Sequence, residues 1–290
     1  METEAKVQWW KVPAAFLITL LIVVLAQFLA QFPQAAADVL GLPAPVGIAA
    51  AAIAYIVLAY LGVKVVMEKL FKVPLHHIRL HKPAIKPVSV VIAVALPAAV
   101  ILTYMMLPGE WTKASMSVSD QVTLVVTAIL FQSIAAGIVE EMVFRGVMFG
   151  LLEKKIPMAV AAIIPSVLFG AVHYSNGMSL AGFLQLLAAG TLVGVMFSVI
   201  CYYSENFWNN ALVHACWNAT TFGVMHIDSK PGDMAIYTYV LHSDSELITG
   251  GDFGIEASVI SIAAYALVIL FFAVLIRRKN KAGTASPAEK

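Results

Sequence analysis

Long apolar runs alternate with short polar segments along most of this 290-residue chain. A membrane-spanning helix needs about 20 mostly apolar residues in a row, and the core of an ordinary soluble domain does not require such runs. Candidate spans cover residues 12–32, 46–63, 87–107, 120–150, 158–173, 180–203, 207–226 and 257–276. The pattern therefore predicts an all-α fold, a polytopic membrane helix bundle with eight transmembrane helices.

Composition strengthens this prediction, because 61% of the residues are hydrophobic, only 12% are charged, and the mean hydropathy is +0.88. Soluble domains carry about 25% charged residues. The net charge of +1 gives no basic footprint for a nucleic-acid partner, so membrane lipids are the expected surroundings. We expect one transmembrane domain over residues 1–281, with a motif core at about 120–226 and a disordered tail over 282–290.

Positive charge gives the predicted orientation, because loops rich in lysine and arginine stay in the cytoplasm. With eight spans, 15 of the 17 lysines and arginines other than Arg145 fall on one side, and only Lys113 and Lys230 fall on the other. This places both termini in the cytoplasm. The basic segment 67–86 is then a cytoplasmic loop that either remains solvated or lies on anionic lipid. The acidic segment 227–256 is expected to be a solvated external loop, with a lid as the alternative.

Three charged residues inside the fourth apolar segment are costly, at roughly 2.5–3.5 kcal/mol each near the bilayer centre. They lie in "EEMVFR" at 140–145. Glu141 and Arg145 are four residues apart and share a helix face, so they can pair. Glu140 is rotated by about 100° and lacks such a partner in its own helix. We therefore expect Glu140 to face His173 across the bundle; the alternative is that all three charges simply join helices.

Polar residues also occur in two later apolar segments, in "FGAVH" at 169–173 and "HACWN" at 214–218. His214 and Asn218 are four residues apart and face the same way, whereas a lone His173 at a span end is often an interfacial residue. A glutamate with a histidine can activate water. A second histidine with an asparagine can stabilise an oxyanion. Together they describe an amide hydrolase that needs no serine or cysteine nucleophile.

A zinc site is the competing chemistry, with Glu140, His173 and His214 as ligands and a water in the fourth position. The chain lacks an H-E-x-x-H pair, so the sequence does not favour a metal or any other cofactor. Ideal helices also place Glu140 and His214 roughly 15 and 10 Å from their cytoplasmic ends, but His173 roughly 24 Å from its own. His173 therefore reaches the site only if its short helix is tilted or starts deeper.

These motifs, in this order, resemble those of the CPBP family of intramembrane proteases, which includes CAAX prenyl endopeptidases and bacterial relatives tied to bacteriocin immunity. The family pattern is E-E-x-x-x-R, then F-x-x-x-H, then H-x-x-x-N or H-x-x-x-D. The similarity covers about residues 139–220, and each motif lies in a hydrophobic segment. The resemblance implies that Glu141 and Arg145 support the site.

The same resemblance implies an intramembrane endopeptidase acting on a peptide or lipidated protein substrate, with prenylated CAAX proteins as the family's best-known target. It implies that Glu140 and His173 activate water and that His214 and Asn218 stabilise the oxyanion. The family has been described both as metal-dependent and as a metal-free glutamate type, and we favour the latter. A non-catalytic binding or immunity protein on the same fold and a proton-coupled transporter remain alternatives.

Overall fold

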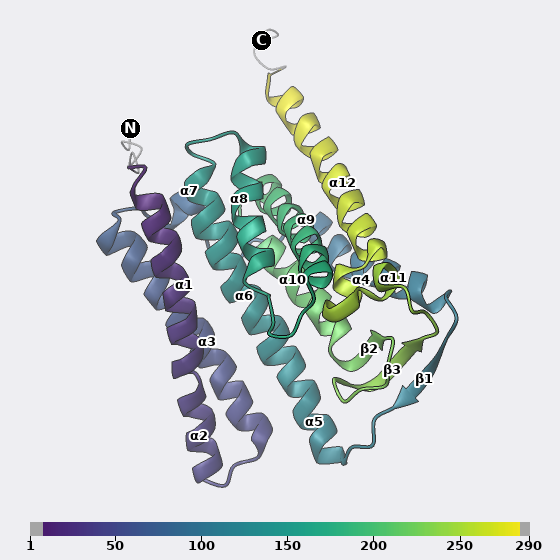
Figure 1. Cartoon of the computed structure of the whole chain (residues 1–290). Coiled ribbons are helices and arrows are strands. Elements are labelled where there is room, and N and C mark those ends of the chain that lie inside the picture. Colours follow the sequence, from purple (N-terminus) through teal and green to yellow (C-terminus); the bar gives the residue numbers. More distant parts are fainter. Residues whose placement is uncertain (1–7, 285–290) are drawn as a thin grey trace.

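The computed structural model describes residues 8–284, and helices dominate it (Figure 1). The α-helices are α1 (Lys11–Leu29), α2 (Gln31–Val39), α3 (Ala44–Val65), α4 (Pro87–Met105), α5 (Val118–Val126), α6 (Ala136–Glu141), α7 (Gly150–Leu152), α8 (Met158–Ala171), α9 (Leu180–Ser204), α10 (Trp208–Thr221), α11 (Glu246–Thr249) and α12 (Val259–Thr284). The π-helical stretches are η1 (Val66–Leu70), η3 (Thr127–Ala135) and η4 (Met142–Phe149). The 3₁₀ turns are η2 (Leu75–Ile78), η5 (Gly251–Phe253) and η6 (Ile255–Ala257).

Six helical stretches in the described part of the chain are long and apolar enough to cross a membrane: Lys11–Val39, Ala44–Leu70, Pro87–Met105, Val118–Leu152, Leu180–Ser204 and Val259–Lys281. The other two predicted spans form α8 and α10, which have 14 residues each. That length corresponds to about 21 Å of helix, against a hydrocarbon core of about 30 Å. The polytopic helical bundle is confirmed, whereas the count of eight spanning helices is not.

The predicted spans 158–173 and 207–226 are longer than α8 and α10 because the C-terminal residues of both segments are not helical. His173 lies beyond the end of α8, and Gly223, with a φ of +86°, starts a strand directly after α10. The all-α prediction also needs correction. A three-stranded sheet pairs β1 (Gly109–Lys113), β3 (Ala235–Leu241) and β2 (Gly223–Asp228) in that order.

Register is fixed on both sides of the central strand of this sheet. β1 runs antiparallel to β3 with Gly109 opposite Leu241, and β2 runs parallel to β3 with Gly223 opposite Ala235. The β-branched and aromatic residues of "AIYTYVL" suit a pleated sheet better than a solvated loop. The segment 227–256 is therefore folded over much of its length, and it lies against the helices rather than free of them.

The basic segment 67–86 packs part of its side chains into the bundle. Leu75, Ile78 and Leu80 are buried in the same core cluster as the η4 residues. Two glycines leave room for Leu80 and Ile78. A Cβ at Gly146 would lie 2.4 Å from the Leu80 side chain, and one at Gly150 would lie 3.0 Å from Ile78 Cα. Burial against the η4 region thus explains why this basic segment contains large apolar side chains.

Arg79 anchors this segment to the bundle. Its guanidinium donates to both carboxylate oxygens of Glu153, at 2.7 and 2.5 Å, and to the carbonyls of Cys201 and Tyr202 at the end of α9. Cations are favourable at helix C-termini because they complement the helix dipole. The segment is therefore held against one end of the bundle, and contact of its exposed residues with anionic lipid stays a prediction.

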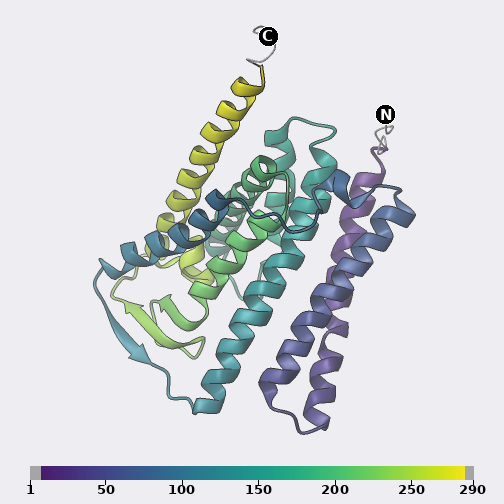
Figure 2. The same cartoon turned by 180° about the vertical axis from the view of Figure 1, so that it is seen from behind.

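The start of α1 and the end of α12 lie at the same end of the bundle, while the sheet lies toward the other end (Figures 1 and 2). This placement agrees with an even number of crossings. The assignment of that end to the cytoplasm stays a prediction from the charge distribution. The predicted tail 282–290 is helical up to Thr284, and its last six residues, 285–290, lie outside the described part of the chain.

Candidate active site in the helix bundle

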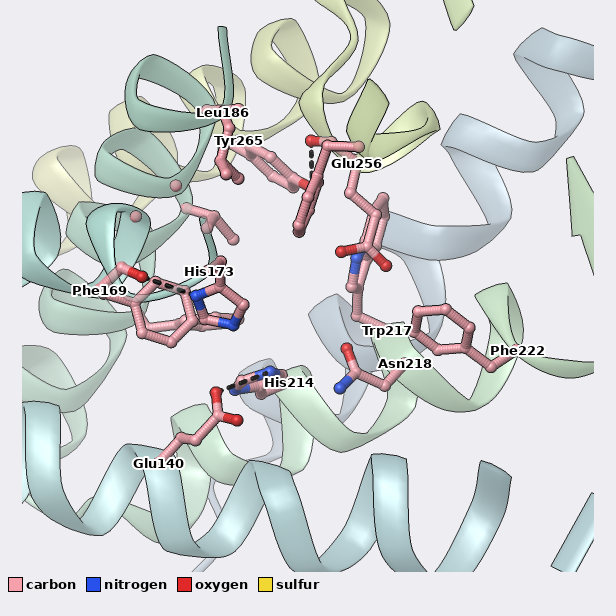
Figure 3. A pocket seen from close by; sticks show the side chains of 16 residues that line it. Glu140, Phe169, His173, Leu186, His214, Trp217, Asn218, Phe222, Glu256 and Tyr265 are labelled. Atoms are coloured by element: carbon pink, nitrogen blue, oxygen red, sulfur yellow. Dashed lines mark hydrogen bonds and ion pairs between the residues drawn. The ribbon is translucent and has the colours of Figure 1, made fainter. Parts of the chain in front are cut away.

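The four catalytic candidates from the sequence line one cavity of about 160 Å³, whereas Glu141 and Arg145 do not line it (Figure 3). Glu140 comes from α6, His173 follows α8, and His214 and Asn218 come from α10. Aromatic and aliphatic side chains form most of the remaining wall. The fold therefore brings three separate sequence motifs to a single polar spot within an apolar bundle.

Close helix contacts make this meeting possible. A Cβ at Gly137 would lie 3.1 Å from the backbone nitrogen of Ala215, so α6 and α10 touch one turn before the glutamates. A Cβ at Gly190 would lie 2.5 Å from Gly170 Cα, which brings α9 against α8 just before His173. Small residues at helix crossings let backbones approach in this way. The glycines thus set the distances between the three motifs.

Glu141 is completely buried and accepts hydrogen bonds from three side chains. Arg145 Nη1 and His214 Nδ1 both lie 2.9 Å from its Oε1, and Asn210 Nδ2 lies 2.6 Å from its Oε2. A buried carboxylate is tolerated when it is paired and hydrogen-bonded in this manner. The predicted Glu141–Arg145 pair is therefore present as one part of a larger network that also holds the catalytic candidate His214.

Arg145 is also fully buried, and aromatic rings surround its remaining edges. Its guanidinium carbon lies 4.5 Å from the ring centre of Phe169 and 5.2 Å from that of Phe197. Gly194 leaves room for it, since a Cβ there would lie 2.8 Å from Arg145 Nη2. Cation–π contacts of this kind compensate part of the desolvation cost of a buried guanidinium.

Glu140 faces the other way, into the cavity, with 24% of its side chain exposed. Its Oε2 has no hydrogen-bond partner among the described residues, and the nearest imidazole nitrogen is His214 Nε2 at 3.9 Å. Glu140 and His173 line the same cavity as expected, but the ring that approaches Glu140 is that of His214. Glu140 and Glu141 are adjacent on the helix, yet the Glu141 carboxylate is fully paired, whereas Oε2 of Glu140 has no hydrogen bond.

His214 connects these two carboxylates. Its Nδ1 donates to Glu141, so its Nε2 is the nitrogen that faces Glu140 and the cavity. Phe197 stacks on the ring with centroids 4.9 Å apart and planes 15° apart, which fixes the ring plane. A histidine held by one nitrogen presents the other in a defined direction, as required for a group that must meet a substrate.

His173 is held in a comparable way, although by backbone rather than by a carboxylate. Its Nδ1 donates to the Phe169 carbonyl at 2.7 Å, and its ring lies 4.7 Å from the Phe169 ring. Nε2 is left to accept a proton or hydrogen bond. Ideal-helix geometry predicts His173 about 10 Å deeper than its partners. The structure nevertheless places it on the cavity wall, so the short α8 does deliver it to the site.

Asn218 lies on the cavity wall one turn after His214. One of its amide hydrogens goes to the carbonyl of Gln132 in η3, at 2.9 Å. The second N–H and the side-chain oxygen are not used by that bond. The π-helical stretch that precedes the glutamates therefore orients Asn218. The second N–H and the side-chain oxygen of Asn218 remain available to a ligand.

Two site residues were missed by sequence reasoning. Asn210 lies in the first turn of α10, where an asparagine is expected to cap the helix, but it binds Glu141 from inside the bundle. Its position four residues before His214, on the same helix face, is the signal that could have identified it. Glu256 was counted as part of an acidic loop, but it lines the cavity. Burial raises the pKa of Glu256, and the Thr221 hydroxyl and the nearby histidines only partly offset it.

A metal ion has no ready-made ligand cluster here. Within residues 8–284, no group of three or more histidine, cysteine, aspartate or glutamate side chains is placed to hold one. The zinc alternative requires Glu140, His173 and His214, which share the cavity without forming such a cluster. The residues therefore do not fit a zinc site as they stand, and the preference for a metal-free reaction stays a prediction.

These features define a class: a polytopic helical membrane protein with a Glu–His–His–Asn constellation inside its bundle. Comparison with known proteins gives the family resemblance. Residues 122–220 match the model of the Rce1-like family, described as type II CAAX prenyl endopeptidase Rce1-like. The match spans all three motifs and confirms the resemblance to CPBP-family proteases.

A second comparison points the same way. The chain is 27% identical over 145 residues to YdiL of Bacillus subtilis (strain 168), a protein provisionally described as a membrane peptidase. The alignment covers 50% of this chain and 54% of YdiL, so the chain spans about half the length of that relative. This likeness agrees with a membrane protease in general, and the activity of this chain is a proposal.

Proposed function

We propose that this protein is an intramembrane endopeptidase in which Glu140 activates the attacking water. The observation that carries the proposal is the contrast within the pair of glutamates. Glu141 is saturated by three hydrogen bonds, whereas Glu140 presents a free carboxylate oxygen to a cavity with two histidines. A general base must be free to reach the proton that it takes.

In the proposed reaction, water lies between Glu140 and Nε2 of His173. Glu140 takes one proton from the water, and the oxygen attacks the carbonyl carbon of the scissile peptide bond. The proton held by Glu140 then passes to the leaving nitrogen as the C–N bond breaks, which releases an amine and a carboxylic acid. General acid–base steps of this type contribute about 10²–10⁴-fold to rate.

His214 and Asn218 are proposed to bind the oxyanion that forms during the attack. Asn218 offers its second N–H, and His214 offers Nε2–H when its ring carries both protons. Donors held in place before the reaction stabilise developing charge without reorganisation. Glu141 and Asn210 act as positioning residues, because they hold His214 through its other nitrogen.

We further propose a peptide or lipidated protein substrate, with a prenylated C-terminal CAAX segment as the candidate suggested by the family description. A cavity lined largely by apolar side chains suits a substrate that carries a lipid anchor. Localisation in a membrane with both termini in the cytoplasm completes the proposal, and the positive charge distribution supports it.

The test uses purified protein and quenched fluorescent peptides made with and without a farnesylated CAAX terminus. Glu140→Gln should lower the cleavage rate by about 10²–10⁴-fold while the melting temperature stays unchanged. Glu110→Gln on the exposed strand β1 is the matched control and should cleave like wild type. Equal cleavage by the Glu140→Gln protein would exclude the proposed role. Zinc near one per chain, with activity lost to chelators, would exclude the metal-free reaction.

A further inference from the structure

A second carboxylate points into the cavity from the wall opposite Glu140, and the reaction just described gives it no task. Glu256 lies on η6, and Figure 3 shows its side chain reaching into the cavity toward Asn218. It comes from a segment outside the three sequence motifs. An acidic side chain inside an apolar bundle is costly and calls for a physical reason.

The protein itself satisfies this carboxylate only in part. Thr221 Oγ1 donates to Glu256 Oε1 at 3.1 Å, while the Tyr265 hydroxyl donates to the backbone carbonyl rather than to the side chain. Among the described residues, no lysine or arginine pairs with Glu256. The carboxylate thus lacks the cationic partner that accompanies Glu141 in Arg145.

Aromatic side chains share the same wall. Trp217, Phe222, Phe253 and Tyr265 all line the cavity together with Glu256. A carboxylate beside aromatic faces is the combination that recognises ammonium and guanidinium groups, since the rings add cation–π attraction to the ion pair.

The wall is held rigidly in place. Gly250 and Gly254 have φ values of +86° and +87°, and a Cβ at Gly250 would lie 1.6 Å from the Gly254 carbonyl oxygen. Asp252 accepts hydrogen bonds from the backbone and hydroxyl of Ser179 at the start of α9, at 2.9 and 3.1 Å. Gln185 adds two bonds, to the carbonyls of Glu246 and Ala257. A site fixed before binding loses little entropy when its ligand arrives.

We propose that Glu256 and the surrounding aromatic residues form a subsite for a lysine or arginine side chain of the peptide substrate. The inference rests on the proposed function, because it makes the cavity a peptide-binding site with a preference for a basic residue near the scissile bond. The cation supplies the partner that Glu256 lacks. It also restores the charged form of a carboxylate whose pKa burial raises.

A role for Glu256 in proton transfer would have a different signature. A group that moves a proton in the reaction affects every substrate, whereas a cation subsite affects only substrates that carry the cation. Selectivity between a basic peptide and its neutral counterpart therefore separates the two roles.

The experiment measures binding in the Glu140→Gln background, so that cleavage is not required. Octapeptides carry one lysine or one norleucine at each position in turn. At one or two adjacent positions, lysine should bind about tenfold more tightly than norleucine, as a charge-assisted hydrogen bond predicts. Adding Glu256→Gln should remove this difference, and adding Glu256→Asp should retain part of it.

Glu246→Gln, an exposed glutamate ten residues earlier in the chain, is the matched control and should leave the preference unchanged. Equal binding of lysine and norleucine peptides at all positions, or a preference that survives Glu256→Gln, would overturn the subsite. Cleavage assays report on the proposed function separately. A Glu140→Gln protein that still cleaves would reject the glutamate mechanism, while the binding data would continue to decide the subsite.

Discussion

Glu140 and Glu141 are neighbours in the chain but belong to two different regions of the molecule. The Glu141 side chain is fully buried and binds Arg145, His214 and Asn210, whereas the Glu140 side chain is 24% exposed and borders the cavity. A single step of about 100° around the helix produces this difference. Two identical side chains can thus have different roles, one supporting the site and the other acting in it, because they project from different faces of the helix.

His214 joins the two regions. One ring nitrogen is bound in the sealed network around Glu141, and the other faces the cavity near Glu140. Changes in the sealed network should therefore mainly lower stability, and they should lower activity only by altering the orientation of the His214 ring. The cavity residues should control activity with little effect on stability.

The largest effect on stability is expected for Glu141→Gln. The substitution leaves the buried Arg145 without its charge partner, which should lower the free energy of unfolding by about 3–5 kcal/mol. Glu140→Gln should change it by less than about 1 kcal/mol, because no hydrogen bond to Oε2 is lost. Denaturant titration of the two proteins in the same detergent measures both values. Similar losses for the two variants would remove the distinction between the regions.

A smaller loss is expected for Asn210→Ala. Without the 2.6 Å bond, Oε2 of Glu141 is buried with no donor, which should cost about 1–3 kcal/mol of unfolding free energy. The kcat for cleavage should also fall, because Glu141 then holds His214 less firmly.

Asn209→Ala is the matched control for that effect on cleavage. Asn209 bonds the backbone of Lys86 and Ala84 and does not contact Glu141. The Asn209→Ala substitution should lower the free energy of unfolding by a similar amount, without a selective loss of kcat. If both asparagine variants lose kcat equally, Asn210 is not a positioning residue.

The smallest effect concerns His226 in β2, whose ring stacks on the cavity-lining Phe222. Burial lowers the pKa of His226, but the hydrogen bond and charge of Asp228, 3.6 Å away, more than offset it, so the pKa lies above its ordinary value. The stabilisation is complete below about pH 6.5 and is lost as the pH rises through the folded-state pKa. His226 and the depressed pKa of Asp228 together predict greatest stability at mildly acidic pH.

His226→Gln should flatten this pH dependence by about 0.5 kcal/mol between roughly pH 6 and pH 8. Melting temperatures at a series of pH values measure it. A His226→Gln protein that keeps the slope would assign the titration to another group.

Much of the bundle was predictable from the apolar runs, because every predicted span contains a helix in the structure. The lengths of α8 and α10 were not predictable, since apolar sequence continues beyond the points where a turn or strand begins. The three motifs predicted which residues would gather, because charged and polar groups inside such runs must find each other. Asn210 and Glu256 were missed because their roles depend on partners distant in the chain.

The sequence by itself determined the class of fold, the polar residues that the bundle must satisfy, and the pairing of Glu141 with Arg145. Those properties follow from hydrophobic burial and helical spacing, which are local. Only the tertiary structure decided that His214 lies between the two glutamates and that Glu256 closes the far wall of the cavity. Glycine contacts between helices and the rigid turn before α12 set those positions, and such contacts between distant segments leave no regular spacing in the chain.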